Sequence, residues 1–291
     1  GRQGLRMKNF IIFNTEKEGS CALISTLDQF EQVTVISDFI EPFDRHMFVN
    51  HPHGPGHDIT KEDFLKCLEL IYGTSEGALE QLNAVYGRYR SDCRFDFAKG
   101  NSVGFKMRFR RKWRKELFSL LKRHGVTAFV LIRQDVLRWA LSKYHGDGTG
   151  KRGHLQFSNV SIKDLPKMEV QWKRLKKQIE RCEKRIADRE RLLEDLRKSG
   201  IAAHPFFYED FCADKTAYFK RLFEALDIPI SEQEIEATLR RGSLYKKVHP
   251  DELSEFISNH EEILGRYEAY RARQKTGRGR TGLNIFKLLY R

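Results

Sequence analysis

Short apolar runs alternate with longer helical patterns along this chain, and this alternation limits the choice of fold more than any other sequence feature. The run with the strongest β pattern, residues 126–133, leads directly into a helical pattern. Comparable runs, each too short for a helix, cover residues 10–14, 33–40 and 102–109 and a late segment that ends near Tyr208. Such alternation indicates βαβ units and a parallel sheet. We therefore expect an α/β fold, a three-layer sandwich with a central, mainly parallel sheet.

Residues 166–199 are expected to form a long charged helix. Its apolar side chains, from Met168 to Leu196, recur in alternating steps of four and three residues, and only Arg189 interrupts the series. A period of 3.5 residues is typical of a narrow coiled-coil stripe. The helix therefore either packs along its own domain or pairs with another helix, and the second alternative predicts a homodimer through residues 166–199.

The rest of the organisation is expected to be simple, with one domain over residues 1–291. Residues 1–6, which precede Met7, are interpreted as an expression remnant, and residues 271–291 as a basic tail. No apolar run approaches the roughly 18–20 residues of a membrane span, so we expect a soluble protein. The five cysteines are dispersed without a CxxC pair, which predicts neither a zinc site nor a disulfide framework and favours a reducing compartment. We therefore expect a cytoplasmic protein, with peripheral association with a membrane as an alternative.

Positive charge is concentrated in a few segments of the chain. Lys and Arg number 53 against 40 Asp and Glu, a formal net charge of +13. The excess lies in residues 106–115, 167–198 and 271–291. Concentrated positive charge predicts a polyanionic ligand, which is nucleic acid, membrane headgroups or a phosphate-rich small molecule.

The loop after the first expected strand, residues 15–21, has the residue types of an anion site. Backbone amides at a helix N-terminus bind anionic oxygen. In this loop Lys17 supplies a mobile charge, Gly19 lets the backbone approach an anion, and Ser20 can donate a hydrogen bond. The GxxxxGK[ST] pattern of a Walker A loop is absent. A glycine-serine turn is also common in ordinary loops, so this loop indicates an anion site only together with a second segment.

The second segment of the expected anion site contains Arg133, which ends the central strand and is followed nine residues later by Ser142. Ligands of parallel sheets bind at the carboxyl ends of the strands. An arginine and a hydroxyl at such an edge form a natural phosphate clamp.

These segments resemble the sulfotransferases that use 3′-phosphoadenosine 5′-phosphosulfate (PAPS). The first loop of that family is commonly T-P-R-x-G-[ST]-[ST]-x-L. This chain matches it at Thr15, Lys17, Gly19, Ser20 and Leu23, and departs from it at Glu16, Glu18 and Cys21. Arg133 and Ser142 match the 3′-phosphate motif of the family.

The resemblance continues late in the chain. Tyr208-Glu209-Asp210-Phe211 is similar to a V-x-Y-E-D-[LFM] segment whose tyrosine lies near the adenine. The segment from Ser258 to Glu262 looks like the N-x-x-E segment of the bacterial carbohydrate and glycolipid branch, which includes trehalose and lipooligosaccharide sulfotransferases.

The resemblance implies a P-loop-like sulfotransferase fold and an enzyme that moves a sulfuryl group from PAPS to a hydroxyl of a carbohydrate or glycolipid. The product nucleotide is 3′-phosphoadenosine 5′-phosphate (PAP), and no metal is required. The implied donor-binding residues are Lys17, Glu18, Gly19, Ser20, Cys21, Ala22, Arg133, Ser142, Tyr208, Arg278, Arg280, Thr281 and Gly282. For the last four, the alternative is a solvated basic tail.

The chemistry needs a carboxylate that accepts the hydroxyl proton and a cation that holds the leaving group. Glu41, in a segment similar to the family pattern G-E-[PY]-F, is the expected base, and Lys17 the expected cation. Four histidines compete with Glu41 for the role of base: His46, His51, His53 and His57. His51 and His53 are also expected to contact the acceptor, since the proline and glycine residues that separate the histidines of residues 51–57 favour an acceptor-side loop over a metal site. Lys106 resembles the lysine of a G-x-K-[IM] segment and is expected to contact acceptor or sulfate.

Two other functions remain open at this point. A kinase-like P-loop enzyme would need magnesium and a Walker lysine, which the loop lacks. A module for nucleic acid or anionic membranes would explain the charge but not Arg133, Ser142 or Tyr208. We therefore expect a hydroxyl-bearing acceptor and no nucleic acid, while the identity of the acceptor stays open.

Overall fold

The computed structural model describes residues 8–15, 18–36, 60–73, 80–82, 84, 102–109, 113–148, 167–241 and 252–277. The chain divides into two compact units. The first comprises Gly1–Asp135 and Lys184–Lys246, and the second comprises Val136–Glu183 and Lys247–Arg291. The organisation of residues 1–291 as one domain stays a prediction.

The described part of the first unit contains a five-stranded sheet with the order β2-β3-β1-β4-β5. Its strands are β1 (Phe10–Phe13), β2 (Val33–Ile36), β3 (Ser102–Met107), β4 (Thr127–Ile132) and β5 (Ala203–Phe207). Every pairing between them is parallel. The expected α/β fold with a parallel sheet is therefore confirmed.

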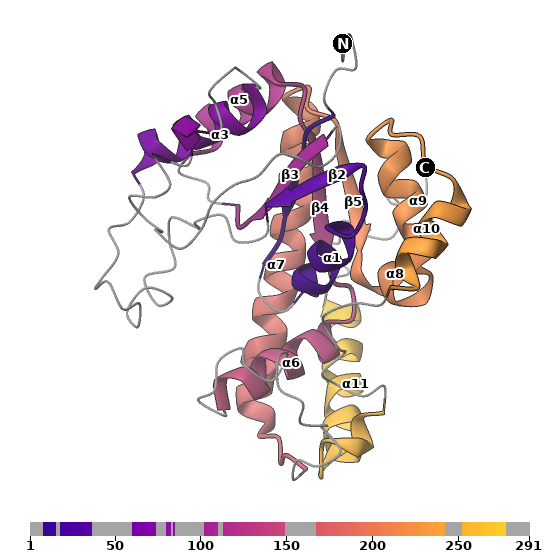
Figure 1. Cartoon of the computed structure of the whole chain (residues 1–291). Coiled ribbons are helices and arrows are strands. Elements are labelled where there is room, and N and C mark those ends of the chain that lie inside the picture. Colours follow the sequence, from indigo (N-terminus) through magenta and orange to yellow (C-terminus); the bar gives the residue numbers. More distant parts are fainter. Residues whose placement is uncertain are drawn as a thin grey trace. The chain divides into compact units, whose positions relative to one another are not determined.

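Helices cover both faces of this sheet. Alternate side chains of each strand point to opposite faces, and since both sets are apolar, each face is buried under helices. In β1, Phe10 and Ile12 belong to one apolar cluster and Ile11 and Phe13 to the other. The second of these clusters is completed by helices α3 (Lys61–Gly73), α5 (Arg114–Arg123) and the part of α7 (Trp172–Lys198) that follows Glu183. The first is completed by α1 (Ser20–Leu27), α8 (Tyr208–Ala213), α9 (Lys215–Ala225) and α10 (Glu232–Leu239). The three-layer arrangement is visible in Figure 1 and was expected.

The second unit contains α6 (Val136–Gly148), the start of α7, the short 3-10 helix η4 (Leu253–Glu255) and α11 (His260–Gly277). Helix α11 packs against the start of α7. The rings of Trp172 and Tyr270 meet edge to face at 6.4 Å, and the Tyr270 hydroxyl donates to Glu183 at 2.7 Å.

The long helix begins later than the sequence suggests. Residues 166–171 were expected to be helical, but α7 starts at Trp172, because Met168 forms a parallel bridge with Ile257 instead. The stripe of apolar residues is otherwise helical, and Leu175, Ile179 and Leu196 are fully buried within the chain. This burial within the chain accounts for these three positions of the stripe, and the homodimer through residues 166–199 stays a prediction.

Candidate functional site

The N-terminus of α1 lies at the carboxyl end of β1, and its backbone amides have the arrangement of an anion site. Gly19 is the N-cap residue with φ of 80°, and neither a side-chain cap nor an acidic residue occurs in the first turn of α1. Asn14, the first residue after β1, donates from Nδ2 to the Ser20 Oγ at 3.0 Å and so holds that hydroxyl in place. Unsatisfied amides and the helix dipole make such an end attractive to phosphate or sulfate.

Tyr208 and Arg133 close over this helix end. A Cβ atom on Gly19 would lie 2.1 Å from Cε2 of Tyr208, so the ring packs directly on the glycine backbone. The Arg133 guanidinium carbon lies 4.8 Å from the centroid of the same ring, within the range of a cation–π contact. Three segments that are far apart in sequence, the first loop and the ends of β4 and β5, therefore meet at one edge of the sheet.

The Tyr208 hydroxyl is neutral at physiological pH. Burial raises the pKa of this phenol well above its usual value, and a hydrogen bond with Cys212 raises it further. Tyr208 therefore presents an uncharged aromatic ring to Arg133 and to any ligand at the site.

Lys106 brings β3 to the same place. Its Nζ donates to the Sγ of Cys21, in the first turn of α1, at 3.2 Å. Lys106 pairs in register with Ile12, whose side chain lies on the α1 face of the sheet. In the loop motif given above, the position of Cys21 usually carries a second hydroxyl. Here the Cys21 thiol accepts the hydrogen bond from Lys106 and so orients the lysine ammonium beside the helix N-terminus.

Glu209 is a residue whose role the sequence analysis missed. Its carboxylate accepts hydrogen bonds from the backbone amides of Gln134, at 3.0 and 3.1 Å, and Asp135, at 2.9 Å. These bonds fix the backbone that follows Arg133. The position of Glu209 in the Tyr-Glu-Asp pattern was the available signal.

Among the described residues of this loop, Glu18 is the one whose carboxylate would repel a bound anion. Its side chain is only 1% exposed, and its Oε2 accepts a hydrogen bond from the Thr15 amide at 2.5 Å. Its other oxygen, Oε1, has no hydrogen-bond partner among the described residues. The site therefore fits a phosphate-bearing ligand at Gly19, Ser20 and Arg133, with one buried carboxylate nearby.

Several predicted site residues lie outside the described residues: Lys17, Glu41, His46, His51, His53, His57, Arg278, Arg280, Thr281 and Gly282. Ser142 lies on α6 in the second unit, whereas Arg133 belongs to the first unit. The clamp formed by Arg133 and Ser142 stays a prediction.

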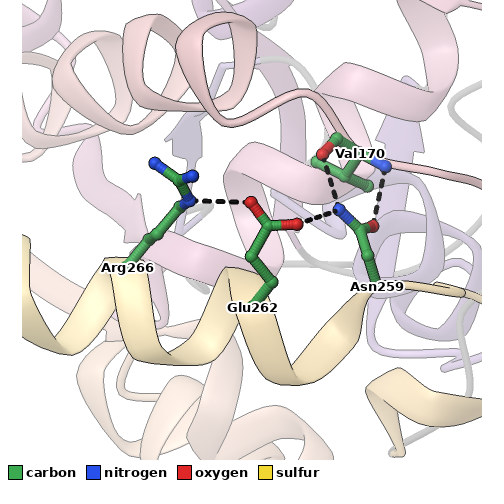
Figure 2. Close-up of polar contacts among 4 residues, drawn as sticks. All are labelled: Val170, Asn259, Glu262 and Arg266. Carbon is green, nitrogen blue, oxygen red and sulfur yellow. Dashed lines mark hydrogen bonds and ion pairs between the residues drawn. The ribbon is translucent and has the colours of Figure 1, made fainter.

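Asn259 and Glu262, which resembled the N-x-x-E segment, form a structural link in the second unit (Figure 2). The Asn259 side chain accepts from the Val170 amide at 2.9 Å and donates to the Val170 carbonyl at 3.0 Å. It also donates to Glu262, which accepts a bond from Arg266 at 2.8 Å. The motif thus joins the start of α11 to the segment that precedes α7.

The described residues contain neither a membrane-spanning helix nor a metal-binding cluster. None of the helices described is both long and apolar enough to cross a membrane. The same residues hold no group of three or more His, Cys, Asp or Glu side chains that could bind a metal ion.

No protein-family model and no curated protein sequence matches the chain. Solved structures do resemble it. The mouse sulfotransferase SULT7A1, complexed with PAP, is 12% identical with a TM-score of 0.41, over 80% of this chain and 63% of that protein. The sulfotransferase from Alicyclobacillus acidocaldarius is 15% identical with a TM-score of 0.39, over 76% and 81%. Retinol dehydratase, in complex with androsterone and inactive cofactor PAP, is 12% identical with a TM-score of 0.45, over 93% and 81%. The chain spans less than two thirds of the mouse protein's length.

Proposed function

We propose that this chain is a sulfotransferase that transfers a sulfuryl group from PAPS to a hydroxyl of a carbohydrate or glycolipid. One observation carries the proposal. Gly19, Arg133 and Tyr208 come from three segments that resemble family motifs in the family's order, and they pack together at the carboxyl edge of a parallel sheet. That edge is where ligands of such sheets bind.

The described residues would bind and orient the donor, which supplies an activated sulfuryl group when bound. The amides at the start of α1 and the Ser20 hydroxyl would donate to the 5′-phosphate region. Arg133, steadied by the ring of Tyr208, would contribute a charged fork. Lys106, oriented by Cys21, would place a second positive charge where negative charge develops during transfer.

The remaining roles in the proposal, on the acceptor and on the donor phosphates, rest on sequence alone. Glu41 would accept the proton of the attacking hydroxyl, and Lys17 would stabilise the leaving phosphate. His51 and His53 would contact the acceptor, while Ser142 and Arg278, Arg280, Thr281 and Gly282 would hold the 3′-phosphate. A Glu41→Gln variant should lose turnover and keep its affinity for PAP, and near-normal turnover would remove Glu41 from this role.

A homodimer through residues 166–199 and a peripheral membrane association stay predictions. Within the stripe of α7, Leu175, Ile179 and Leu196 are buried inside the chain, whereas Trp172 and Ile186 are half-buried. The cytoplasmic location stays a prediction that rests on the dispersed cysteines.

A thermal-shift comparison tests the donor class. PAP without magnesium should stabilise the protein, since a ligand at 100 times its Kd adds about 2.7 kcal/mol to the unfolding free energy. For a domain of 150 to 250 residues that is a rise in Tm of roughly 5–10 °C. ATP with magnesium should have little effect. Stabilisation by ATP with magnesium but not by PAP would instead favour a kinase-like enzyme.

Transfer itself is tested by incubation with PAPS labelled in its sulfuryl group and a panel of sugar and glycolipid hydroxyls. The proposal expects label in at least one acceptor and, at a PAPS concentration well below its Kd, roughly 10- to 100-fold slower labelling after Arg133→Met. PAP binding without transfer to any hydroxyl of the panel would limit the conclusion to donor binding.

A further inference from the structure

The described part of the first unit contains a hollow lined mainly by charged side chains, which the sequence pattern did not predict. It has a volume of about 490 Å³. Its lining comes from the segments after β1 and β3 and from helices α5 and α7. The lining residues are Thr15, Phe109, Arg114, Arg185, Asp188, Arg189, Arg191, Leu192 and Asp195. We refer to it as the arginine cleft.

The arginine cleft carries an excess of positive charge. Its lining contains four arginines and two aspartates. The aspartates pair with two of the arginines, Asp188 with Arg191 at 2.7 Å and Asp195 with Arg114 at 2.9 Å. The lining therefore has a net formal charge of +2, four minus two.

Arg185 and Arg189 lie one helical turn apart on α7, so their side chains share one face of the helix. Arg189 is 4% exposed. The Nη1 atom of Arg185 is buried and has no hydrogen-bond partner among the described residues. A buried guanidinium nitrogen without a partner is costly, and an anionic ligand in the cleft would offset that cost.

The position of the cleft relates it to the candidate donor site. Thr15 lies two residues after β1 and opens the loop that leads to Gly19, and Phe109 lies two residues after β3. The cleft is therefore at the carboxyl edge of the sheet. Its α5 and α7 residues belong to the helical layer opposite α1. A ligand in the cleft would lie beside the start of the donor loop.

The size and chemistry of the cleft define a ligand class. Small-molecule sites usually occupy about 300–1,000 Å³, so the cleft could hold a sugar unit with its substituents. The planar guanidinium fork of an arginine binds carboxylate, phosphate or sulfate in preference to neutral hydroxyls. We propose that the arginine cleft binds an anionic group of the acceptor, so that this enzyme sulfates an acidic saccharide or glycolipid. This inference rests on the function proposed above.

Calorimetry on the PAP-saturated protein tests the inference. The probes are trehalose, which is neutral, trehalose 6-phosphate, which carries a phosphate ester, and cellobiouronic acid, which carries a carboxylate. At least one anionic probe should bind about tenfold more tightly than trehalose, since hydrogen bonds to charged groups are the stronger ones. The comparison of the two anionic probes distinguishes phosphate from carboxylate as the source of the charge.

Substitutions link this preference to the cleft. Arg185→Ala should abolish the preference, and Arg185→Lys, which keeps the charge without the fork, should retain part of it. Arg181→Ala is the matched control, because Arg181 is exposed on the same helix and outside the cleft. Equal binding of all three probes, or an undiminished preference in Arg185→Ala, overturns the inference.

The same titrations separate this inference from the proposed function. PAP should bind Arg185→Ala and the unaltered protein equally well. If PAP fails to bind the unaltered protein, the proposed donor is wrong, and the anion preference measured without PAP still decides whether the cleft selects anions. If PAP binds and the anionic probes bind no more tightly than trehalose, the proposed donor site is supported and the proposed role of the arginine cleft is wrong.

Discussion

The backbone of Gly19 has a φ of 80° and lies directly under the ring of Tyr208, so two separate effects favour glycine there. A side chain in the left-handed region costs about 1–2 kcal/mol. A Cβ atom would also overlap the ring, and overpacking of this kind typically costs about 1–3 kcal/mol. Gly19→Ala should therefore lower the unfolding free energy by about 2–5 kcal/mol in urea denaturation.

Gly125→Ala is the matched control for this prediction. Gly125 has a φ of 61°, but a Cβ atom there would meet nothing within 4 Å. It should show only the backbone cost, about 1–2 kcal/mol. Gly19→Ala should approach that smaller cost when Tyr208 is also replaced by Ala. Equal costs at the two glycines in the unaltered background would contradict the packing of Tyr208 on Gly19.

Glu18 places a buried negative charge beside the proposed phosphate site. Glu18→Gln keeps an oxygen that can accept the bond from the Thr15 amide but removes the charge. PAP should bind this variant more tightly, by about tenfold, which corresponds to about 1.4 kcal/mol. Isothermal titration measures the change. Glu31→Gln, an exposed position, should leave the affinity unaltered, and weaker binding in Glu18→Gln would show that the carboxylate supports the site.

At the scale of the element, β5 carries a histidine that makes stability depend on pH. Burial lowers the pKa of His204 below its usual value, and Arg197 lowers it further. The unfolded chain, with a histidine pKa near 6.5, therefore binds a proton before the folded protein does. The contribution of His204 is complete above about pH 7 and is lost as the pH falls through about 6.5 toward the lower, folded pKa.

The measurement is the urea unfolding free energy between pH 7.5 and 5. His204→Gln should make its decline with falling pH shallower, by less than the roughly 1.4 kcal/mol per pH unit that one whole proton gives. Part of the decline should persist, since burial also lowers the pKa of His124. A steeper decline in the variant would mean that His204 is protonated in the folded state.

The link between α11 and the segment before α7 depends on the Asn259 side chain. Two of its bonds satisfy the backbone of Val170 (Figure 2). Asn259→Ala leaves these groups without their partner, at a cost of about 1–3 kcal/mol. Amide exchange at Val170 should accelerate about tenfold or more, measured by hydrogen–deuterium exchange. Glu261→Gln, an exposed neighbour, should leave it unchanged, and equal rates in all three proteins would show that the link is not stabilising.

At the scale of the whole molecule, the fold was largely predictable because each strand is a short apolar run. Residues 126–133 illustrate this, since β4 occupies Thr127–Ile132. The start of α7 was not predictable, because a bridge to Ile257, nearly ninety residues away in sequence, keeps Met168 out of the helix. Local patterns predict local structure, and long-range pairing overrides them at the ends of elements.

The candidate site, like the fold, was predictable from the sequence only in part. Gly19 and Arg133 were identified by their residue types and positions, and Tyr208 by the family resemblance. The packing of the Tyr208 ring on Gly19 could not be predicted, since it depends on the register of β1, β4 and β5. The arginine cleft was missed although Arg189 gave a signal by interrupting an apolar stripe. A charged residue in that stripe is buried only if the fold supplies surroundings for it, and these surroundings come from other segments.

The central claim is that Arg133 and its neighbours bind a 3′-phosphoadenosine nucleotide, and isothermal titration of PAP without magnesium tests it most directly. Arg133→Met keeps an apolar contact for Tyr208 and removes the charge. It should weaken PAP binding by roughly 10- to 100-fold, the worth of hydrogen bonds to a charged group. Lys122→Met, which removes an exposed charge from the end of α5, should bind PAP like the unaltered protein. No heat of PAP binding to the unaltered protein, or equal affinity in Arg133→Met, would contradict the account.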